Sequence, residues 1–210
     1  MNTQTTDLPN VNARPRRTWL QRLGRLLLRL MGWRVVDRRP PGRKFIVIGA
    51  FHTSNMDFFI ALPAMMALGL RPRWIGKKEL FRGPLGPLMR FLGGIPVDRS
   101  VRSGFVGQMV HNFRTHEDFV VLIAPEGTRK FTDHWKSGFY HIAVQAGVPI
   151  ALGFLDYPTR TVGIGDYFLP TGDDEADLER IRAFYADKRG RYPEKHSTIR
   201  LKQKKKQDPS

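Results

Sequence analysis

Apolar residues recur at helical spacing over residues 16–34, near the start of the chain. Arg22, Arg25 and Arg29 fall mainly elsewhere on the helical wheel, so the segment predicts a basic amphipathic helix. Such a helix can lie in a lipid interface with its arginines on anionic headgroups, or pack on its own domain with a solvated arginine face. Three consecutive leucines and two tryptophans favour the lipid interface. The apolar positions are Trp19, Leu20, Leu23, Leu26, Leu27, Leu30 and Met31.

Beyond Gly42 the pattern changes to short apolar runs that alternate with helical segments. Short apolar runs bounded by glycine or proline predict strands, and longer runs with helical spacing predict helices. Strands are expected near 44–50, 73–75, 95–97, 119–124, 149–155 and 161–164, and helices near 57–68, 102–115, 137–147 and 173–188. This alternation predicts an α/β fold: a single layered domain with a largely buried mixed sheet flanked by helices, preceded by the basic amphipathic helix.

The chain divides by composition into one domain and its flanking segments. Its 210 residues, 41% of them hydrophobic, suffice to bury one substantial core. Residues 1–13 are polar and without periodicity, so we expect disorder there. Residues 14–40 hold the amphipathic helix and a linker, the domain spans 41–192, and 193–210 form a basic tail that is expected to be solvated.

Charge narrows the set of partners. Lysine and arginine total 35 against 19 acidic residues, a net charge of +16 that attracts nucleic acid, anionic lipid or acidic carrier proteins. The absence of cysteine excludes disulfides, thiolate zinc sites and cysteine nucleophiles. Because arginines interrupt the leucine-rich segment, we expect neither a membrane-spanning helix nor a cleaved secretory signal.

His52 and Asp57 lie at a predicted junction between a strand and a helix. Positions five apart on a regular helix lie about 140° apart, so these side chains can meet only across a turn. A strand that ends at Ala50, with Ser54 or Asn55 as the helix N-cap, would allow this. A carboxylate on one imidazole nitrogen fixes the tautomer, and the other nitrogen can then accept a proton from a substrate hydroxyl. Taken alone, such a pair is more often a hydrogen-bonded loop without a catalytic role.

Two further segments combine turn residues with cations. Residues 93–99 form a glycine-opened short strand that ends at Arg99, whose paired donors can hold a phosphate, although a surface arginine paired with Asp98 would look the same. Residues 124–130 follow the most apolar strand, at the place where α/β sheets bind ligands. Their backbone amides, hydroxyl and two cations suit one anion, and the alternative is a surface turn with a basic end.

Together, the three segments resemble the glycerolipid acyltransferase family. Its bacterial lysophosphatidic acid acyltransferases carry a histidine, four residues and an aspartate, then a glycine-to-arginine block, then a proline-glutamate-glycine-threonine-arginine block. The order and approximate spacing agree over residues 44–155, and Val148, Pro149 and Ile150 stand where the family has a fourth motif. Phe51 stands where many members have asparagine and Ala124 where many have phenylalanine, and both departures could alter acceptor choice.

The resemblance implies that His52 is the general base and Asp57 its orienting partner. It also implies a substrate-binding pocket around the acceptor's phosphate, with a basic segment beside it. These residues are Arg99, Glu126, Gly127, Thr128 and Arg129, with Lys77 and Lys78 in the basic segment. The implied reaction moves a fatty acyl group from acyl-CoA or acyl carrier protein to the free hydroxyl of lysophosphatidic acid in phospholipid biosynthesis. No cofactor is expected, and one histidine with one aspartate is an incomplete metal ligand set.

An anionic membrane surface is the expected partner, with the protein peripheral on the cytoplasmic face of the inner or plasma membrane. Three alternatives remain. The same chemistry could act on glycerol 3-phosphate or a lyso amino-acid lipid. A nucleic-acid-binding module is suggested by the charge, but interleaved aromatics and a polar recognition helix are not evident, so no nucleic acid is expected. A catalytically silent membrane-binding homologue is disfavoured by the intact motif residues.

Overall fold

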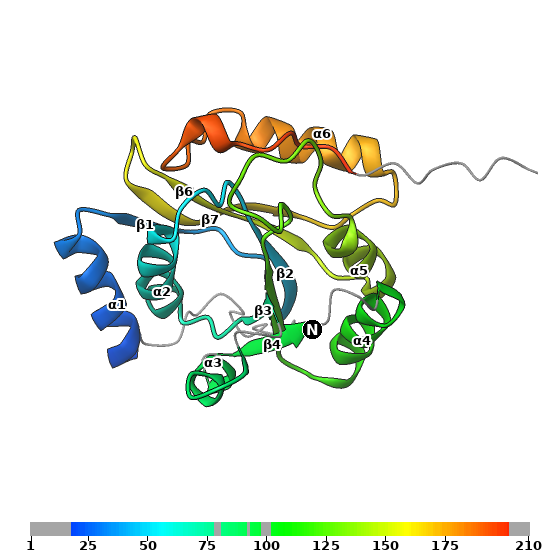
Figure 1. Ribbon diagram of the computed structural model, residues 1–210, viewed down its shortest axis with the longest axis horizontal. Coiled ribbons are helices and arrows are strands. Elements are labelled where there is room, and N and C mark those ends of the chain that lie inside the picture. The colour runs from blue at the N-terminus through cyan, green and yellow to red at the C-terminus, as the bar shows by residue number, and fades with distance from the viewer. Residues whose placement is uncertain (1–17, 78–80, 92, 98–101, 202–210) are drawn as a thin grey trace, which may run out of the picture.

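The computed structural model describes residues 18–77, 81–91, 93–97 and 102–201, and these form a mixed sheet flanked by helices (Figure 1). The strands are β1 (Arg34–Asp37), β2 (Lys44–Gly49), β3 (Arg73–Lys77), β4 (Gly94–Val97), β5 (Phe119–Ile123), β6 (Ile150–Asp156) and β7 (Thr161–Phe168). They lie in the order β1-β7-β6-β2-β5-β3-β4. The paired neighbours run parallel except β6 and β7, which are antiparallel. The predicted mixed α/β architecture is therefore confirmed.

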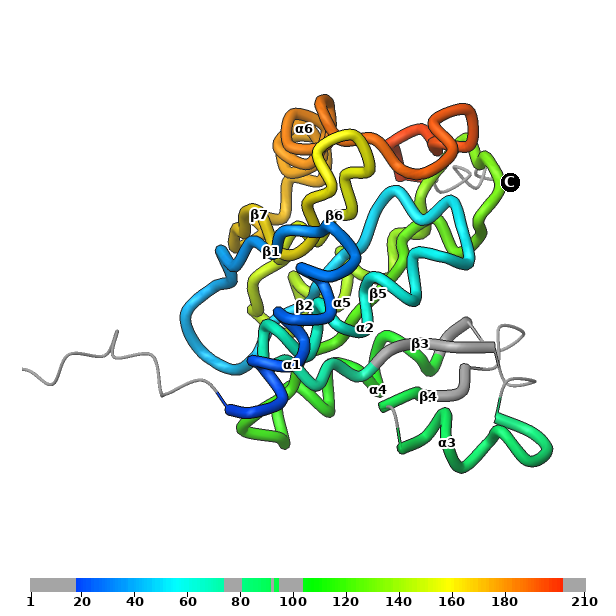
Figure 2. Tube along the Cα trace, turned by 90° about the vertical axis from the view of Figure 1, so that its left-hand side faces the viewer, coloured from blue at the N-terminus to red at the C-terminus, as the bar shows by residue number. Residues whose placement is uncertain are grey.

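Helices cover both faces of this sheet. They are α1 (Trp19–Leu30), α2 (Met56–Leu68), α3 (Gly86–Phe91), α4 (Arg102–Thr115), α5 (Gly138–Ala146) and α6 (Asp174–Tyr185), with a 3-10 helix, η2 (Pro193–Lys195). Figure 1 shows α1 and α2 on one side of the sheet and α4 and α5 on the other. In the view of Figure 2, α6 and α3 lie at opposite ends of the molecule.

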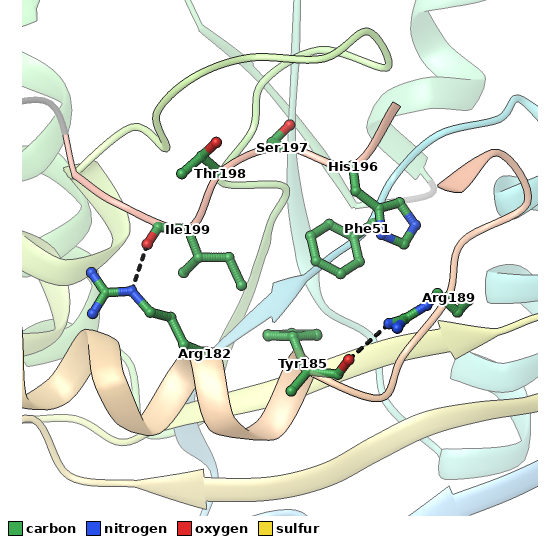
Figure 3. Close-up of a pocket in the computed structure, with 9 residues that line it drawn as sticks. Phe51, Arg182, Tyr185, Arg189, His196, Ser197, Thr198 and Ile199 are labelled. Atoms are coloured by element: carbon green, nitrogen blue, oxygen red, sulfur yellow. Dashed lines mark hydrogen bonds between the residues drawn. The ribbon is translucent and has the colours of Figure 1, made fainter. Parts of the chain in front are cut away.

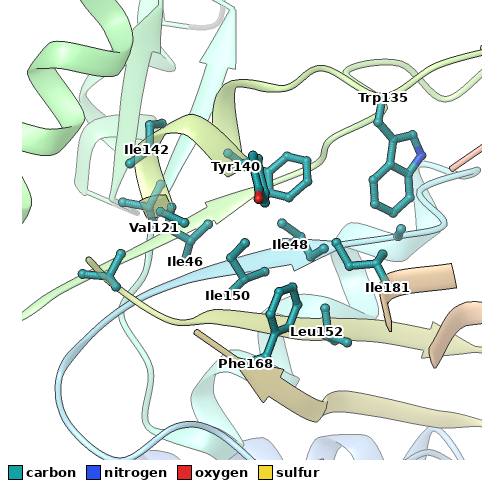
Figure 4. Packing of buried hydrophobic residues seen from close by; sticks show 14 of the residues in the cluster. Ile46, Ile48, Val121, Trp135, Tyr140, Ile142, Ile150, Leu152, Phe168 and Ile181 are labelled. Atoms are coloured by element: carbon teal, nitrogen blue, oxygen red, sulfur yellow. The ribbon is translucent and has the colours of Figure 1, made fainter. Parts of the chain in front are cut away.

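The alternation of side chains along each strand divides the core between the two faces. Ile46 and Ile48 of β2 point toward α5 and α6, where they join Ile142 and Ile181 in the larger cluster (Figure 4). The intervening Phe45 and Val47 point to the other face, where Leu68 of α2 covers them. Because both faces are buried, the central strands are apolar throughout, which explains why β2, β5 and β6 are visible in the sequence as continuous apolar runs.

The amphipathic helix α1 begins at a capping box and packs on α2. Thr18 Oγ1 accepts a hydrogen bond from the Gln21 amide at 3.4 Å, and Gln21 Oε1 accepts one from the Thr18 amide at 2.8 Å. Gly24 lets the helices approach closely, since a Cβ atom there would lie 2.5 Å from the Ala67 nitrogen. Leu28 is buried in the same contact. No helix in the described parts of the chain is both long enough and apolar enough to cross a membrane.

Three strands deliver their loops to one edge of the sheet. β2 lies between β5 and β6 and is parallel to both, so the carboxyl ends of all three strands meet. The loop after β2 carries the predicted histidine, and the predicted aspartate follows it in the first turn of α2. The loop after β5 carries the predicted anion-binding turn. The turn after β6 begins at Tyr157. This edge is where an α/β sheet is expected to place its ligand site.

Most sequence predictions of elements are confirmed within a few residues, but three segments differ. β1 lies in the expected linker and pairs with β7, so part of that linker belongs to the sheet. α3 occupies a stretch that its glycines and prolines marked as turns, because proline is tolerated in a first helical turn. Residues 193–201 of the expected tail pack on the domain. The disorder predicted for 1–13 and the tail at 202–210 concern residues outside the described part.

Candidate active site

The loop between β2 and α2 is organised by Asp57, which sits in the first turn of α2. Its Oδ2 atom accepts hydrogen bonds from the amides of Thr53 at 3.0 Å and Ser54 at 2.9 Å. Ser54 Oγ in turn accepts from the Met56 amide at 3.1 Å, while Asn55, the N-cap residue, makes no side-chain capping bond. The aspartate is thus fixed by the main chain of the loop that precedes it.

His52 meets Asp57 across this turn. The His52 Nδ1 atom lies 3.0 Å from Asp57 Oδ2, and the side chains are 30% and 2% exposed respectively. Burial alone would raise the pKa of Asp57, but hydrogen bonds from His52, the Ser54 amide and Tyr157 outweigh it and hold this pKa below its ordinary value. Asp57 is therefore ionised at neutral pH, which favours the tautomer that carries the imidazole proton on Nδ1 and leaves Nε2 as an acceptor.

The loop after β5 brings Arg129 and Glu126 to opposite sides of His52. Arg129 Nε donates toward His52 Nε2 at 3.4 Å from the exposed side. Glu126 is 3% exposed, and its Oε2 atom accepts a hydrogen bond from the His52 amide at 2.8 Å. Burial raises the pKa of Glu126, and the bond from the His52 amide opposes that shift only in part. Glu126 therefore holds the main chain of His52, and Arg129 faces its Nε2 atom.

Gly127 and Thr128 shape the turn between these side chains. Gly127 has φ +64°, a left-handed backbone conformation that favours glycine, and the Lys136 side chain lies over it. Thr128 Oγ1 accepts from the Lys130 amide at 3.2 Å. The turn predicted from the sequence therefore lies directly beside the His52–Asp57 pair, here called the dyad, and its cationic end is exposed.

The remaining predicted residues belong to β3, β4 and the loops that follow them. Lys77 is the last residue of β3 and pairs in register with Val97, the last residue of β4. Because β3 is parallel to β5 and β4 is parallel to β3, β3 and β4 end at the edge of the sheet that carries the His52–Asp57 pair. Arg99 and Lys78, together with the side chain of Lys77, lie outside what the structure describes.

A C-terminal segment, residues 186–201, covers the loop that carries His52. Thr53 Oγ1 accepts a hydrogen bond from the Tyr192 amide at 3.2 Å. The ring of His196 stacks on Phe51, with centroids 3.9 Å apart and planes 11° from parallel (Figure 3). Sequence reasoning missed both contacts, because no spacing rule links residues about 140 positions apart. The segment fixes Phe51, the residue next to the histidine.

A shallow cavity of about 310 Å³ lies beside this segment but is distinct from the dyad. Phe51, Tyr185 and His196 line it, whereas His52 and Asp57 do not (Figure 3). Two arginines at its rim are engaged: Arg182 Nε donates to the Ile199 carbonyl at 2.9 Å, and Arg189 Nη1 to the Ala186 carbonyl at 2.8 Å. Within the described residues, no group of three or more histidine or acidic side chains could hold a metal ion.

Comparison with known proteins adds a family to this geometry. The family model described as Acyltransferase matches residues 32–151, more than half of the chain. The chain belongs to the Acyltransferase family. The predicted resemblance is thereby confirmed. The match includes the dyad and the turn after β5 but ends before Tyr157 and the C-terminal segment.

Individual members of the Acyltransferase family agree with this assignment. The human and bovine proteins named 1-acyl-sn-glycerol-3-phosphate acyltransferase alpha are each 33% identical over 117 residues, 53% of this chain. The chain spans about two fifths of their length, 40% and 39% respectively. The crystal structure of the 1-acyl-sn-glycerophosphate (LPA) acyltransferase PlsC from Thermotoga maritima aligns with a TM-score of 0.52 and 23% identity, over 79% of this chain and 74% of that one. The latter likeness shows a shared fold.

Proposed function

We propose that this protein transfers a fatty acyl group from acyl-CoA or acyl carrier protein to the free hydroxyl of lysophosphatidic acid, as a step of phospholipid biosynthesis. The observation that carries the proposal is the 3.0 Å contact between His52 Nδ1 and Asp57 Oδ2 at the ligand-binding edge of the sheet. Membership of the Acyltransferase family supports the reaction class, and the names of the human and bovine relatives support the acceptor.

In this mechanism His52 is a general base and Asp57 stabilises the imidazolium that forms. His52 Nε2 takes the proton of the acceptor hydroxyl as the hydroxyl oxygen attacks the thioester carbonyl carbon. The carbon–sulfur bond then breaks, and the leaving thiolate receives the proton from the imidazolium. An ionised, buried aspartate on Nδ1 favours the charged ring at the moment it forms. The enzyme needs no covalent intermediate, because both reactants are bound together.

The acceptor's phosphate would be held by the cationic end of the turn after β5. Arg129 is exposed and already points at the reactive nitrogen, so a phosphate bound by its guanidinium would place the neighbouring hydroxyl at His52. Binding would also draw Arg129 away from Nε2 and free that atom for the proton. Arg99, Lys77 and Lys78 are proposed to line the same pocket, with Gly127 and Thr128 in its wall. For Glu126 we propose an indirect role, because its buried carboxylate holds His52 and would repel a phosphate.

Association with an anionic membrane surface follows from α1. Its exposed apolar side chains include Trp19, Leu26 and Leu30, which are 70%, 52% and 76% exposed. Phe59 of α2, the helix on which α1 packs, is also 59% exposed. A peripheral protein on the cytoplasmic face of the inner or plasma membrane would bury these side chains among acyl chains while its arginines contact anionic headgroups.

The decisive experiment is transfer of a labelled acyl group from its thioester to lysophosphatidic acid in liposomes. We expect activity in the wild type and a loss of roughly 1,000-fold or more in His52→Ala. His141→Ala is the matched control, since that histidine is exposed on α5. Equal activity of wild type and His52→Ala would remove His52 from the mechanism. Activity with glycerol 3-phosphate or a lyso amino-acid lipid in place of lysophosphatidic acid would keep the chemistry and change the acceptor.

A further inference from the structure

The Asp57 carboxylate is held on both of its oxygens, and the second partner comes from far along the chain. Oδ2 faces His52 and the loop amides, whereas Oδ1 accepts a hydrogen bond from the Tyr157 hydroxyl at 2.8 Å. Tyr157 opens the turn after β6, 100 residues beyond Asp57 and outside the segment that matches the Acyltransferase family.

Tyr157 is itself firmly placed. Its amide donates to the Arg189 carbonyl at 3.0 Å, which ties it to the C-terminal segment. The ring of Trp33 packs edge-on against its ring, with centroids 5.1 Å apart and planes 90° apart. Trp33 is 8% exposed and follows directly on α1, where its amide donates to the Leu28 carbonyl at 2.7 Å. Tyr157 thus stands between the docked helix and the catalytic aspartate.

We infer that Tyr157 is a positioning residue, whose hydroxyl fixes the orientation of the Asp57 carboxylate toward His52, and that Trp33 couples α1 to this contact. The inference rests on the proposed function for its catalytic consequence. It goes beyond that function because the family motifs assign no role to either aromatic residue.

The physical reason is the freedom of a carboxylate to rotate about its Cβ–Cγ bond. A bond on Oδ1 opposes this rotation, so Oδ2 stays in line with the Nδ1 proton of His52. Burial, followed by the hydrogen bond to Asp57, raises the pKa of Tyr157 far above its ordinary value, so the hydroxyl remains a donor wherever the enzyme works. The side chain of Arg191 interacts with the Tyr157 hydroxyl and opposes this rise in pKa only in part. The other charged groups at the His52–Asp57 pair are Glu126 on the His52 amide and Arg129 on Nε2. Neither contacts Oδ1.

The first test measures positioning without any substrate. The ¹⁵N shifts of the two ring nitrogens report the fraction of neutral His52 that carries its proton on Nδ1, with His52→Gln assigning the signals. We expect this fraction to fall in Tyr157→Phe and to stay at the wild-type level in Tyr167→Phe, a matched control on the exposed part of β7. An unchanged fraction in Tyr157→Phe would overturn the inference, whatever the acceptor of the enzyme proves to be.

The second test measures the kinetic consequence. In Tyr157→Phe we expect kcat to fall roughly 10-fold with KM for the acceptor almost unchanged, because orientation of the base is lost while binding groups remain. If the wild-type protein showed no acyl transfer, the proposed function would be contradicted. The tautomer measurement would still decide the role of Tyr157. Unchanged kcat in Tyr157→Phe would contradict the positioning role directly.

Trp33 is tested by a double-mutant cycle. Trp33→Leu should lower both kcat and the Nδ1-protonated fraction, and it should have little further effect in the Tyr157→Phe background, because the two residues act through one contact. The melting temperature of each variant distinguishes a loss of this contact from a general loss of stability. Fully additive effects on kcat would show that Trp33 acts independently of Tyr157 and would contradict the proposed coupling of α1 to this contact.

Discussion

Glu126 is a buried residue that holds the main chain of His52. One of its carboxylate oxygens accepts a hydrogen bond from the His52 amide. The other, Oε1, is buried near Ser197, and among the described residues it makes no hydrogen bond of good geometry. An ionised carboxylate in this position costs free energy, which is why burial raises its pKa. The site thus carries a pH-dependent cost to stability that is separate from its chemistry.

This cost makes a prediction for Glu126→Gln. Because the folded protein binds a proton more tightly than the unfolded chain at Glu126, the free energy of unfolding falls as pH rises from the ordinary pKa of the carboxyl through its raised value. Glutamine keeps an acceptor for the His52 amide and cannot ionise. The variant should therefore gain stability relative to the wild type as pH increases across this range, measured by denaturant unfolding at a series of pH values.

The control for this prediction is Glu117→Gln, since Glu117 is exposed. Its difference from the wild type should not follow the same pH course. If the Glu126→Gln difference were also constant with pH, Glu126 would have the same proton affinity in both states, contrary to the burial argument.

The dyad was predictable from sequence because its members are close in the chain. A histidine and an aspartate five positions apart at a strand-to-helix junction can meet in few ways, and the structure shows the contact across the turn. The roles of Tyr157 and His196 could not be anticipated in this manner. A tyrosine after a strand or a histidine in a polar segment carries no signal of its partner until the strand order is known.

At the scale of secondary-structure elements, α1 combines two surfaces with different tasks. Gly24 and Leu28 form the side that packs on α2, and residues such as Leu26 and Leu30 remain exposed. The sequence predicted the amphipathic helix but left open whether its apolar side packs on the domain or faces lipid. In the structure Leu20 is half-buried, whereas the other six predicted apolar positions are exposed, so the helix packs on α2 mainly through a different side.

The exposed portion predicts the strength of lipid binding. Leu26→Ser with Leu30→Ser should weaken binding to liposomes of anionic phospholipid on the order of 10- to 100-fold. A fully buried leucine contributes about 1.5–3 kcal/mol, and a helix lying in the interface buries each leucine about halfway. Stability should change little, since both side chains are exposed at 52% and 76%. Sedimentation with liposomes measures the effect.

Leu169→Ser provides the matched control, as Leu169 is 61% exposed after β7 and lies outside α1. Binding that survives the α1 double substitution unchanged would show that another surface carries the attachment. Binding lost equally in Leu169→Ser would point to a general effect of surface apolarity.

Elements with strong periodicity were predicted well, and the exceptions have physical causes. β2 is apolar because both of its faces are buried. α4 has a helical pattern because it is buried on one side, at Met109, Val110 and Phe113. β1 has four residues and an exposed arginine, and its pairing with β7 depends on a partner more than 120 positions away. α3 begins with glycine and proline, which local propensity assigns to turns.

At the scale of the whole molecule, the C-terminal segment covers the loop that carries His52. His196 accepts a hydrogen bond from the Gly190 amide through Nε2 at 2.9 Å and stacks on Phe51. An imidazole that accepts this bond must be neutral at Nε2. Burial, followed by the charge of Arg189, lowers the pKa of His196. The contacts of the C-terminal segment with Gly190 and Phe51 therefore require a neutral His196 ring.

Acidification should weaken these contacts. Because the unfolded segment binds a proton at His196 more readily than the folded one, the stabilisation is complete above the ordinary pKa of histidine and is lost as pH falls through the lowered value. Amide hydrogen exchange of peptides from 186–201 should accelerate at low pH beyond the intrinsic pH dependence of exchange. His196→Gln should show faster exchange at neutral pH and lack the acid-induced step. An acid step of full size in His196→Gln would exclude His196 as its origin.

Strand order at this scale could not be read from the sequence. Alternating strands and helices predicted the layered class, and short apolar runs predicted the members of the sheet. The position of β6 beside β2, which brings Tyr157 to Asp57, depends on long-range pairing for which a single sequence holds no local pattern. Likewise, nothing in the lysine-rich composition indicated that residues 193–201 pack on the domain.

The contributions to the dyad are spread over residues 52–57, 126–129, 157 and 192–196, and this sets an order of events during synthesis. The helix α1 is made before any of these segments, whereas β1 cannot pair until β7 has emerged, and Thr53 and Phe51 meet their partners Tyr192 and His196 only after about 140 further residues have been made. The nascent chain thus presents α1, the helix that we propose binds lipid, well before Tyr157 can hold the Asp57 carboxylate in place. Attachment would precede catalytic competence, so a chain stalled before Tyr157 would bind lipid without turning over substrate.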